Sequence, residues 1–134
     1  MGMTIGDAAM QSGLPVKTVR YYDEIKLVSP SSRTAAGYRQ YSVDELHRLT
    51  FVKRARSFGF SVDDCRQLLS LFADQSRSSR EVKAFANRRL EEIEEKMRDM
   101  QALHAELKSL AQRCPGNEGA DCPILASLAS DAER

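Results

Sequence analysis

The chain has 134 residues, of which 42% are hydrophobic and 29% charged, and its net charge is +1. This length predicts one domain, or a small domain with an appendage, and this composition excludes a disordered or fibrous protein. The sequence has no apolar run of about 18 residues, so we expect no membrane span. It also lacks a basic segment followed by an apolar stretch at its start. We therefore expect a cytoplasmic protein whose thiols stay reduced.

The charge is divided unevenly along the chain. Residues 1–60 hold nine Lys/Arg and five Asp/Glu, a balance of +4, whereas residues 61–134 hold eleven and fourteen, a balance of −3. The N-terminal half can therefore face a polyanion, and the C-terminal half cannot. Chance unevenness in a short chain is the alternative.

Two short helices are expected near the N-terminus, over about 4–12 and 15–25. Thr4 stands three residues before Asp7, as in a capping box with aspartate in place of glutamate, and the second helix begins with a proline, which is favoured there. The connection between them contains Gly13. Two short helices joined in this way are typical of a helix-turn-helix motif, although other helical hairpins share the pattern.

The residues after these helices predict a β-wing. Leu27-Val28 leads into a Ser/Pro stretch, and Arg33-Thr-Ala-Ala-Gly-Tyr-Arg-Gln-Tyr41 then reads as two short extended segments joined by small residues. The arginine and tyrosine side chains of this segment suit phosphate contacts, as charged and hydroxyl donors. An ordinary solvated hairpin is the alternative.

Three further helices each open with a serine placed three residues before an acid, the signature of a capping box. They are expected at 43–57 with Ser42/Glu45, at 61–73 with Ser61/Asp64 and at 78–113 with Ser78/Glu81. Cys65 falls on the second of these helices, and we interpret it as a buried structural thiol.

The last of the three, at 78–113, would be roughly 54 Å long. Its apolar positions alternate in steps of four and three, which is the seam of a coiled coil. The seam consists of Ala86, Leu90, Ile93, Met97, Met100, His104, Leu107 and Ala111. So long a helix cannot bury this seam against so small a domain, so we expect a homodimer. We interpret His104 as a polar register residue and the methionines as packing.

Two of the three cysteines, Cys114 and Cys122, bracket a loop of seven turn-forming and small residues. A disulfide, half of a zinc site and a two-thiolate site for a soft monovalent ion all fit such a pair. Reduced thiols and the odd third cysteine weigh against the disulfide. Structural zinc takes four ligands, and although Glu118 and Asp121 could add oxygens to the two sulfurs, no histidine is nearby in the sequence. Two soft thiolates suit Cu(I), and by the same softness Ag(I) and Au(I).

The loop also lies between two helix ends. Pro115-Gly116 stops the long helix, and Pro123 can start a short terminal helix over 124–130. Cys122 would then lie near the N-cap of this helix, where the partial positive charge lowers the pKa of a thiol. A lower pKa favours the thiolate, the form that binds metal.

The segments Thr4-Ile-Gly-Asp-Ala-Ala, Gly13-Leu-Pro-Val-Lys-Thr-Val-Arg-Tyr-Tyr-Asp-Glu24 and Gly37-Tyr-Arg-Gln-Tyr41 closely resemble the MerR family of bacterial transcription regulators. One departure is Ile25-Lys26, where relatives often carry Lys-Gly. The resemblance covers nearly the whole chain and implies a mainly α fold in three parts. These are a winged helix-turn-helix DNA-binding domain with connector helices (1–75), an antiparallel coiled-coil dimerisation helix (76–113), and a metal-binding loop with a short terminal helix (114–134).

The resemblance implies roles for individual residues. On the second helix and the wing, and in the helix that follows, the DNA-binding residues would be Lys17, Arg20, Tyr22, Arg33, Tyr38, Arg39 and Arg54. The first three would face the major groove and its flanking phosphates, the next three would serve the wing, and the last would reach the backbone. Core packing is the expected role of Tyr21.

The loop resembles that of the copper-responsive CueR/HmrR branch, which places Cys114 and Cys122 as the metal ligands. In this branch the long helix of the partner subunit begins with a serine near the site, where sensors of divalent metals carry a cysteine. Ser79 occupies this position and withholds a third sulfur, and Lys83 can offset the negative charge of the bis-thiolate. Helix capping and an ordinary surface lysine are the alternatives for these two residues.

The function implied is a Cu(I)-responsive activator of copper-resistance or efflux genes, which also takes Ag(I) or Au(I). Its homodimer binds double-stranded promoter DNA and, on binding metal, distorts the DNA so that RNA polymerase can engage it. A regulator of the same family that senses a divalent metal or thiol oxidation is the alternative. We expect no enzyme, because neither His47 nor His104 is paired with a nucleophile. A copper chaperone would not need a DNA-binding wing.

Overall fold

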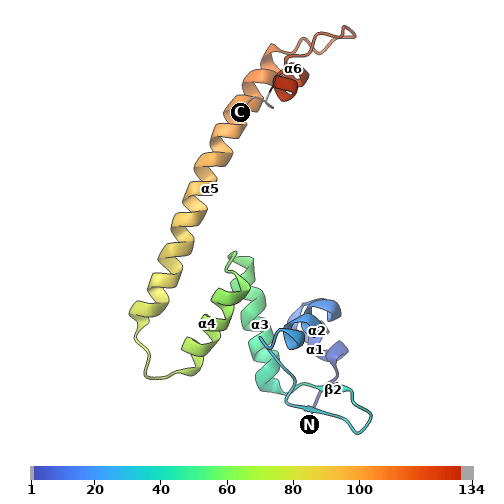
Figure 1. Cartoon of the computed structure of the whole chain (residues 1–134), viewed down its shortest axis with the longest axis vertical. Helices are drawn as coiled ribbons and strands as arrows, with labels where there is room; N and C mark the ends of the chain where they lie inside the picture. The colour runs from blue at the N-terminus through green and yellow to red at the C-terminus, as the bar shows by residue number, and fades with distance from the viewer. Residues whose placement is uncertain (1, 131–134) are drawn as a thin grey trace. The chain divides into compact units, whose positions relative to one another are not determined.

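The computed structural model describes residues 2–130 (Figure 1). Its elements are, in order, α1 (Ile5–Ser12), α2 (Val16–Glu24), β1 (Ser32–Arg33), β2 (Arg39–Gln40), α3 (Val43–Ser57), α4 (Val62–Ala73), α5 (Ser79–Arg113) and α6 (Pro123–Ser130). The mainly helical fold predicted from the sequence is confirmed. Each helix begins and ends within one residue of its expected position.

Local caps explain why the helix boundaries could be predicted. Two of the expected capping boxes, Ser42/Glu45 and Ser61/Asp64, are fully formed. The Ser42 backbone amide donates to Glu45 Oε1 at 2.9 Å, and the Glu45 amide donates back to Ser42 Oγ at 3.3 Å. Thr4 Oγ1 accepts the amide three residues on at 3.0 Å. These bonds satisfy amides that a helix start leaves without an intrahelical partner.

One apolar core holds α1 to α4 and the wing together. Helix α1 packs on α2 and α3, and α3 packs on α4. The largest side chains with almost no exposed surface are Tyr41, Leu49, Val19, Val28, Val52 and Cys65. The interpretation of Cys65 as a buried thiol is thus confirmed, and burial raises its pKa.

The wing is a very short antiparallel hairpin. Strand β1 pairs with β2 so that Arg33 stands opposite Arg39, and Gly37 takes the left-handed conformation in the turn with φ 90°. Just beyond β2, Tyr41 exchanges two backbone hydrogen bonds with Met3, both 2.8 Å long. The root of the wing is thereby attached to the segment that precedes α1.

The turn that follows α2 has an unusual backbone. Lys26 has φ 60°, in the left-handed region that a residue with a side chain rarely adopts. The Arg66 guanidinium, from α4, donates to the carbonyls of Ile25 and Lys26 at 3.0 and 2.9 Å. The turn after α2 is therefore formed although Ile25-Lys26 stands where relatives often carry Lys-Gly, and Arg66 binds both carbonyls of this dipeptide.

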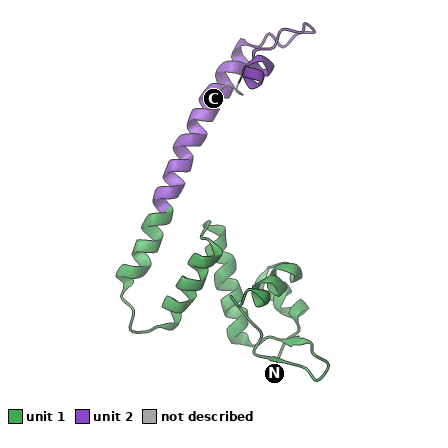
Figure 2. Cartoon of the chain, in the orientation of Figure 1, with its two compact units in different colours: residues 1–89 green, residues 90–134 purple. Residues whose placement is uncertain are grey.

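The chain divides into two compact units, residues 1–89 and 90–134 (Figure 2). The division falls inside α5, and the three functional parts expected from the sequence stay predictions. The start of α5 belongs to the first unit because Phe85 packs against its core and Arg88 pairs with Asp64 at 2.8 Å. Across residues 2–130, no helix combines the length and the apolar character that crossing a bilayer would need.

Candidate DNA-binding face and thiol loop

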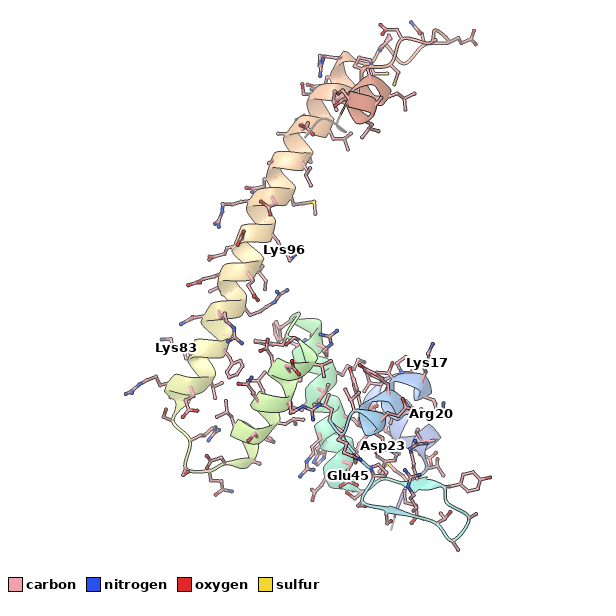
Figure 3. All side chains as sticks on the ribbon, viewed as in Figure 1. Lys17, Arg20, Asp23, Glu45, Lys83 and Lys96 are labelled. Carbon is pink, nitrogen blue, oxygen red and sulfur yellow. The ribbon has the colours of Figure 1, made fainter. Side chains whose placement is uncertain are left out.

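The outer face of α2 carries a group of polar side chains (Figure 3). Lys17, Arg20, Tyr21 and Glu24 border a hollow of about 440 Å³. Because these positions are three or four residues apart, they share one side of the helix. Lys17 and Arg20 are exposed, as residues predicted to face a DNA groove must be. Such cations can donate to base edges and to phosphates.

The two adjacent tyrosines of α2 exchange the roles predicted for them. Tyr22, expected to face the groove, is 5% exposed and belongs to the core, whereas Tyr21, expected in the core, is 49% exposed. The reason is helical periodicity: Tyr22 lies three residues after the fully buried Val19, so both point inward. Burial raises the pKa of Tyr22. Tyr21 therefore replaces Tyr22 on the exposed face.

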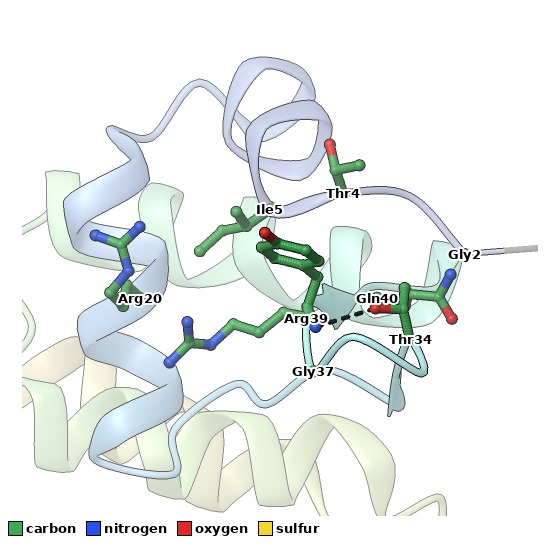
Figure 4. A pocket seen from close by; sticks show the side chains of 9 residues that line it. Gly2, Thr4, Ile5, Arg20, Thr34, Gly37, Arg39 and Gln40 are labelled. Atoms are coloured by element: carbon green, nitrogen blue, oxygen red, sulfur yellow. Dashed lines mark hydrogen bonds between the residues drawn. The ribbon is translucent and has the colours of Figure 1, made fainter.

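A second hollow, of about 430 Å³, lies between α1, α2 and the wing (Figure 4). Arg20 of α2 and Arg39 of the wing both line it, together with Tyr38, which is 74% exposed. Guanidinium and hydroxyl donors that border one hollow can serve neighbouring oxygens of a phosphate backbone. The DNA contacts of these residues stay predictions.

The wing arginines already have a partner inside the protein. Arg39 Nε lies 2.7 Å from Asp23 Oδ2, and Arg33 Nη2 lies 3.3 Å from the same oxygen. Arg33 Nη1 also donates to the carbonyl of Gly37 at 3.2 Å. The Arg39 side chain is 22% exposed and that of Arg33 is 50% exposed. Arg33 is therefore the more accessible of the two for an outside partner.

Asp23 receives more contacts than these two ion pairs. Its burial would raise its pKa, but hydrogen bonds from Arg39 and Ser29, with the charges of Arg39 and Arg33, hold the pKa below its ordinary value. Asp23 therefore stays ionised in the folded protein.

Arg54, the DNA-binding residue predicted on α3, is exposed. Its guanidinium carbon lies 4.8 Å from the centre of the Phe58 ring, in cation–π contact. The contact restricts the side chain without using its hydrogen-bond donors. A contact to the DNA backbone stays a prediction for this residue.

The thiol loop occupies the predicted place between α5 and α6. Cys114 closes α5, since its amide donates to the Leu110 carbonyl at 3.1 Å. The Cys122 carbonyl accepts the Ala126 amide at 3.1 Å in the first turn of α6. Both cysteines are free thiols with partly exposed side chains, and the Cys114 thiol lies near enough to Cys122 to help lower its pKa. The loop therefore brings the two sulfurs together.

The N-terminus of α6 lowers the pKa of Cys122. The hydrogen bond from the Leu125 amide lowers this pKa most. Burial raises the pKa, whereas the Cys114 thiol and the Ile124 amide lower it further. This is the direction expected for a thiol at a helix N-terminus. The site thus favours a thiolate at Cys122.

The donor set of the loop can be tested against the metals considered. Among residues 2–130, no group of three or more His, Cys, Asp or Glu side chains could hold a metal ion. Four-coordinate zinc lacks ligands in such a set, whereas two soft sulfurs fit a monovalent d10 ion such as Cu(I). The residues present therefore fit Cu(I).

Ser79 and Lys83 lie at the start of α5 and are exposed. They belong to the first unit, whereas the loop belongs to the second. Their roles beside the metal site of a partner subunit stay predictions.

The predicted seam of α5 is largely exposed in the single chain. Leu90, Met97, Met100 and Leu107 are between 52% and 65% exposed. His104, at the polar position of the seam, is exposed as well. An apolar face of this length on one helix indicates a surface that a partner covers.

Sequence reasoning missed two residues of α2, the exposed Tyr21 and the buried Asp23 that binds the wing arginines. The spacing of Lys17, Arg20 and Glu24 on one helix side could have found Tyr21. Nothing local marks Asp23, because its arginine partners are 10 and 16 residues away.

Comparison with known proteins agrees with this geometry. Residues 3–71 match the family described as MerR HTH family regulatory protein, and residues 46–110 match the family described as MerR, DNA binding. The HTH-type transcriptional regulator HmrR of Rhizobium leguminosarum bv. viciae is 45% identical over 130 residues, which cover 97% of this chain and 100% of that protein. The HTH-type transcriptional regulator CueR of Yersinia pestis is 46% identical over 127 residues, which cover 95% and 91%.

A solved structure agrees as well. The transcription regulator PbrR691 from Ralstonia metallidurans CH34, in complex with lead(II), superposes with a TM-score of 0.79 at 31% identity, over 94% of this chain and 98% of that one. The chain therefore belongs to the MerR family of helix-turn-helix transcriptional regulators, on the metal-responsive branch that contains CueR and HmrR.

Proposed function

We propose that this protein is a Cu(I)-responsive transcriptional activator, with Ag(I) and Au(I) as surrogates for its natural ion. The observation that carries the proposal is the pair of adjoining thiols, Cys114 and Cys122, in a loop with no third soft donor among the described residues. When bound, the ion supplies a soft, linear link between two thiolates. Cys122 provides one thiolate readily, because the α6 N-terminus lowers its pKa.

The proposed selectivity against divalent ions depends on what the site lacks. Zinc and other divalent ions need further ligands beyond two sulfurs. Ser79 offers a hydroxyl, not a thiolate, at the position where divalent-metal relatives carry cysteine. We assign it the role of withholding a third sulfur across the dimer, and Lys83 that of offsetting negative charge. HmrR and CueR, at 45% and 46% identity, are nearer in sequence than PbrR691 with its lead(II) at 31%, so the divalent-metal and thiol-redox alternatives are not favoured.

The proposed active form is a homodimer. The seam of α5 leaves long apolar side chains exposed, including Met97 and Leu107 at 56% and 58%. A second copy of the same helix, laid antiparallel, would cover these side chains. Two DNA-binding domains would then read two half-sites related by two-fold symmetry.

On DNA, the dimer would hold a promoter in the cytoplasm and distort it when the ion binds, so that RNA polymerase engages both promoter elements. Lys17 and Arg20 would face the groove, with Tyr21 in place of Tyr22, and Arg33 and Tyr38 would face phosphates. The copper-resistance or efflux genes named above are the proposed targets.

The test is anaerobic transcription in vitro by RNA polymerase. The template carries an operator selected by the intact protein from a pool of random duplexes, placed in a long promoter spacer. We expect Cu(I) to raise transcript yield and Zn(II) to leave it unchanged. Cys114→Ser and Cys122→Ser are expected to abolish the Cu(I) response while DNA binding persists.

Cys65→Ala is the matched control, because Cys65 is fully buried in the first unit and is not part of the loop. It should keep the response to Cu(I). A response to Zn(II) alone, or a Cu(I) response that survives both loop substitutions, would overturn the proposal.

A further inference from the structure

We propose that Asp23 is a positioning residue for DNA binding, which holds Arg33 and Arg39 of the wing against α2 so that helix and wing meet DNA as one surface. The inference rests on the DNA-binding role of the first unit. Asp23 carries a negative charge in a face that must bind a polyanion, so by charge alone its removal should strengthen DNA binding.

The need for such a residue follows from the register of the wing. Arg33 and Arg39 are direct cross-strand partners in the antiparallel pair. Like charges placed directly opposite each other destabilise a sheet. The hairpin has only two residue pairs, and so small a hairpin has little stability of its own. The two guanidinium groups would therefore push the strands apart unless an anion stood between them.

Asp23 is that anion, and it comes from outside the hairpin. A single oxygen, Oδ2, accepts from Arg39 Nε at 2.7 Å and from Arg33 Nη2 at 3.3 Å. The Asp23 side chain is only 11% exposed, so water screens these contacts weakly. Because Asp23 lies on the inner side of α2, the contacts fix the wing to the helix that carries Arg20 (Figure 3).

One carboxylate does not neutralise two guanidinium groups. Arg33 remains half-exposed, and its Nη1 also holds the carbonyl of Gly37 in the turn of the wing. A net positive charge therefore stays at the wing, in a fixed position beside Tyr38 and near Arg20. Fixed donors lose less conformational entropy when they bind phosphates than free side chains do.

The test compares Asp23→Asn with Asp44→Asn in the full-length protein. Both remove one negative charge, and Asp44 is an exposed residue in the first turn of α3. The probe is a duplex selected by the unmodified protein from a random pool, and affinity is measured at several salt concentrations. Successful selection with the unmodified protein establishes DNA binding independently of Asp23.

We expect Asp23→Asn to weaken binding about tenfold, while Asp44→Asn leaves it unchanged or strengthens it. The salt dependence should separate positioning from a general loss of folded protein. If the wing loses one phosphate contact, the plot of log K against log salt concentration should become less steep by roughly 0.9. A lower fraction of folded protein would leave this slope unchanged.

A second pair of variants decides the matter if Asp23→Asn does not fold. In an Arg33→Gln/Arg39→Gln background the wing has no charges to position, so adding Asp23→Asn should cause no further loss and should relieve a buried unpaired charge. A further loss in that background would overturn the proposal. So would a folded Asp23→Asn protein that binds as tightly as Asp44→Asn with the same salt slope.

Discussion

The two units of the chain differ in how completely each buries its own apolar surface. Residues 1–89 enclose a core in which Leu49, Val52 and Tyr41 have no exposed surface. In residues 90–130, Leu110 is the one described residue that counts as buried. The first unit is therefore complete as a single chain, whereas the second presents half of an interface. The difference agrees with our proposal that each protomer supplies its own DNA-binding domain, whereas the metal-sensing part needs a second protomer.

The hydrogen bonds follow the same division. In the first unit, residues far apart in sequence are connected, as Glu45 Oε1 is to the Ser31 amide at 3.0 Å and Arg66 is to the turn after α2. In the second unit, the Gly119 amide donates to Asn117 Oδ1 at 2.8 Å and Ser130 Oγ donates to the Ser127 carbonyl at 3.0 Å, both between near neighbours. We therefore expect the second unit to depend on a partner for its order.

The largest effect is expected from the core of the first unit. Leu49→Ala removes a fully buried side chain and leaves a cavity. We expect a loss of about 2–5 kcal/mol in the free energy of unfolding, measured by urea denaturation. The change should be the same at all protein concentrations. A strong dependence on concentration would show that the first unit is not self-sufficient.

A smaller effect is expected from the seam of α5, and it should depend on concentration. Leu107→Glu places a charge where we propose that a partner helix packs, and should cost the dimer about 2 kcal/mol in association free energy. Ala102→Glu, off the seam on the same helix, is the matched control. Sedimentation equilibrium measures both. Equal dissociation constants for the two variants would contradict the proposed dimer.

Acid should loosen the first unit through two buried carboxylates. Burial would raise the pKa of Asp23 and of Glu45, but hydrogen bonds hold both below their ordinary values. A lowered pKa means that these groups stabilise the fold above their unfolded pKa, near 4, and that this stability is lost as the pH falls through the folded values. When the unfolding free energy is measured from pH 6 to 3, it should therefore decrease once the pH is lower than about 4. The decrease should be smaller in Glu45→Gln.

The smallest effect is expected at the turn after α2. Lys26 has φ 60°, which strains any residue with a Cβ, so Lys26→Gly should raise the unfolding free energy by about 1 kcal/mol or less. Thermal unfolding measures the change. A loss of stability would mean that the lysine side chain contributes more than its backbone costs.

The boundaries of the helices could be predicted from sequence because caps and periodicity are local. Ser42 and Ser61 mark helix starts with bonds that span three residues. The roles of Tyr21 and Tyr22 were predicted the wrong way round, although the same periodicity separates them, because Tyr22 lies three residues after the buried Val19. Asp23 was missed because its contacts depend on how the wing folds back onto α2.

The metal site shows a similar limit. Cys114 and Cys122 could be paired from sequence because one loop joins them, and their chemistry follows from the softness of sulfur. The placement of Ser79 relative to the loop depends on a second subunit, so it comes from the family resemblance alone.

The most direct test of the proposed sensor is an anaerobic titration of the reduced protein with Cu(I) and then Zn(II), against a competing chelator. We predict tight uptake of one Cu(I) per loop, lost in Cys114→Ser and in Cys122→Ser, kept in Cys65→Ala, and weak, easily displaced Zn(II). Preferential uptake of Zn(II), or Cu(I) binding that is indifferent to both loop substitutions, would contradict the assignment of the thiol pair as a monovalent metal site.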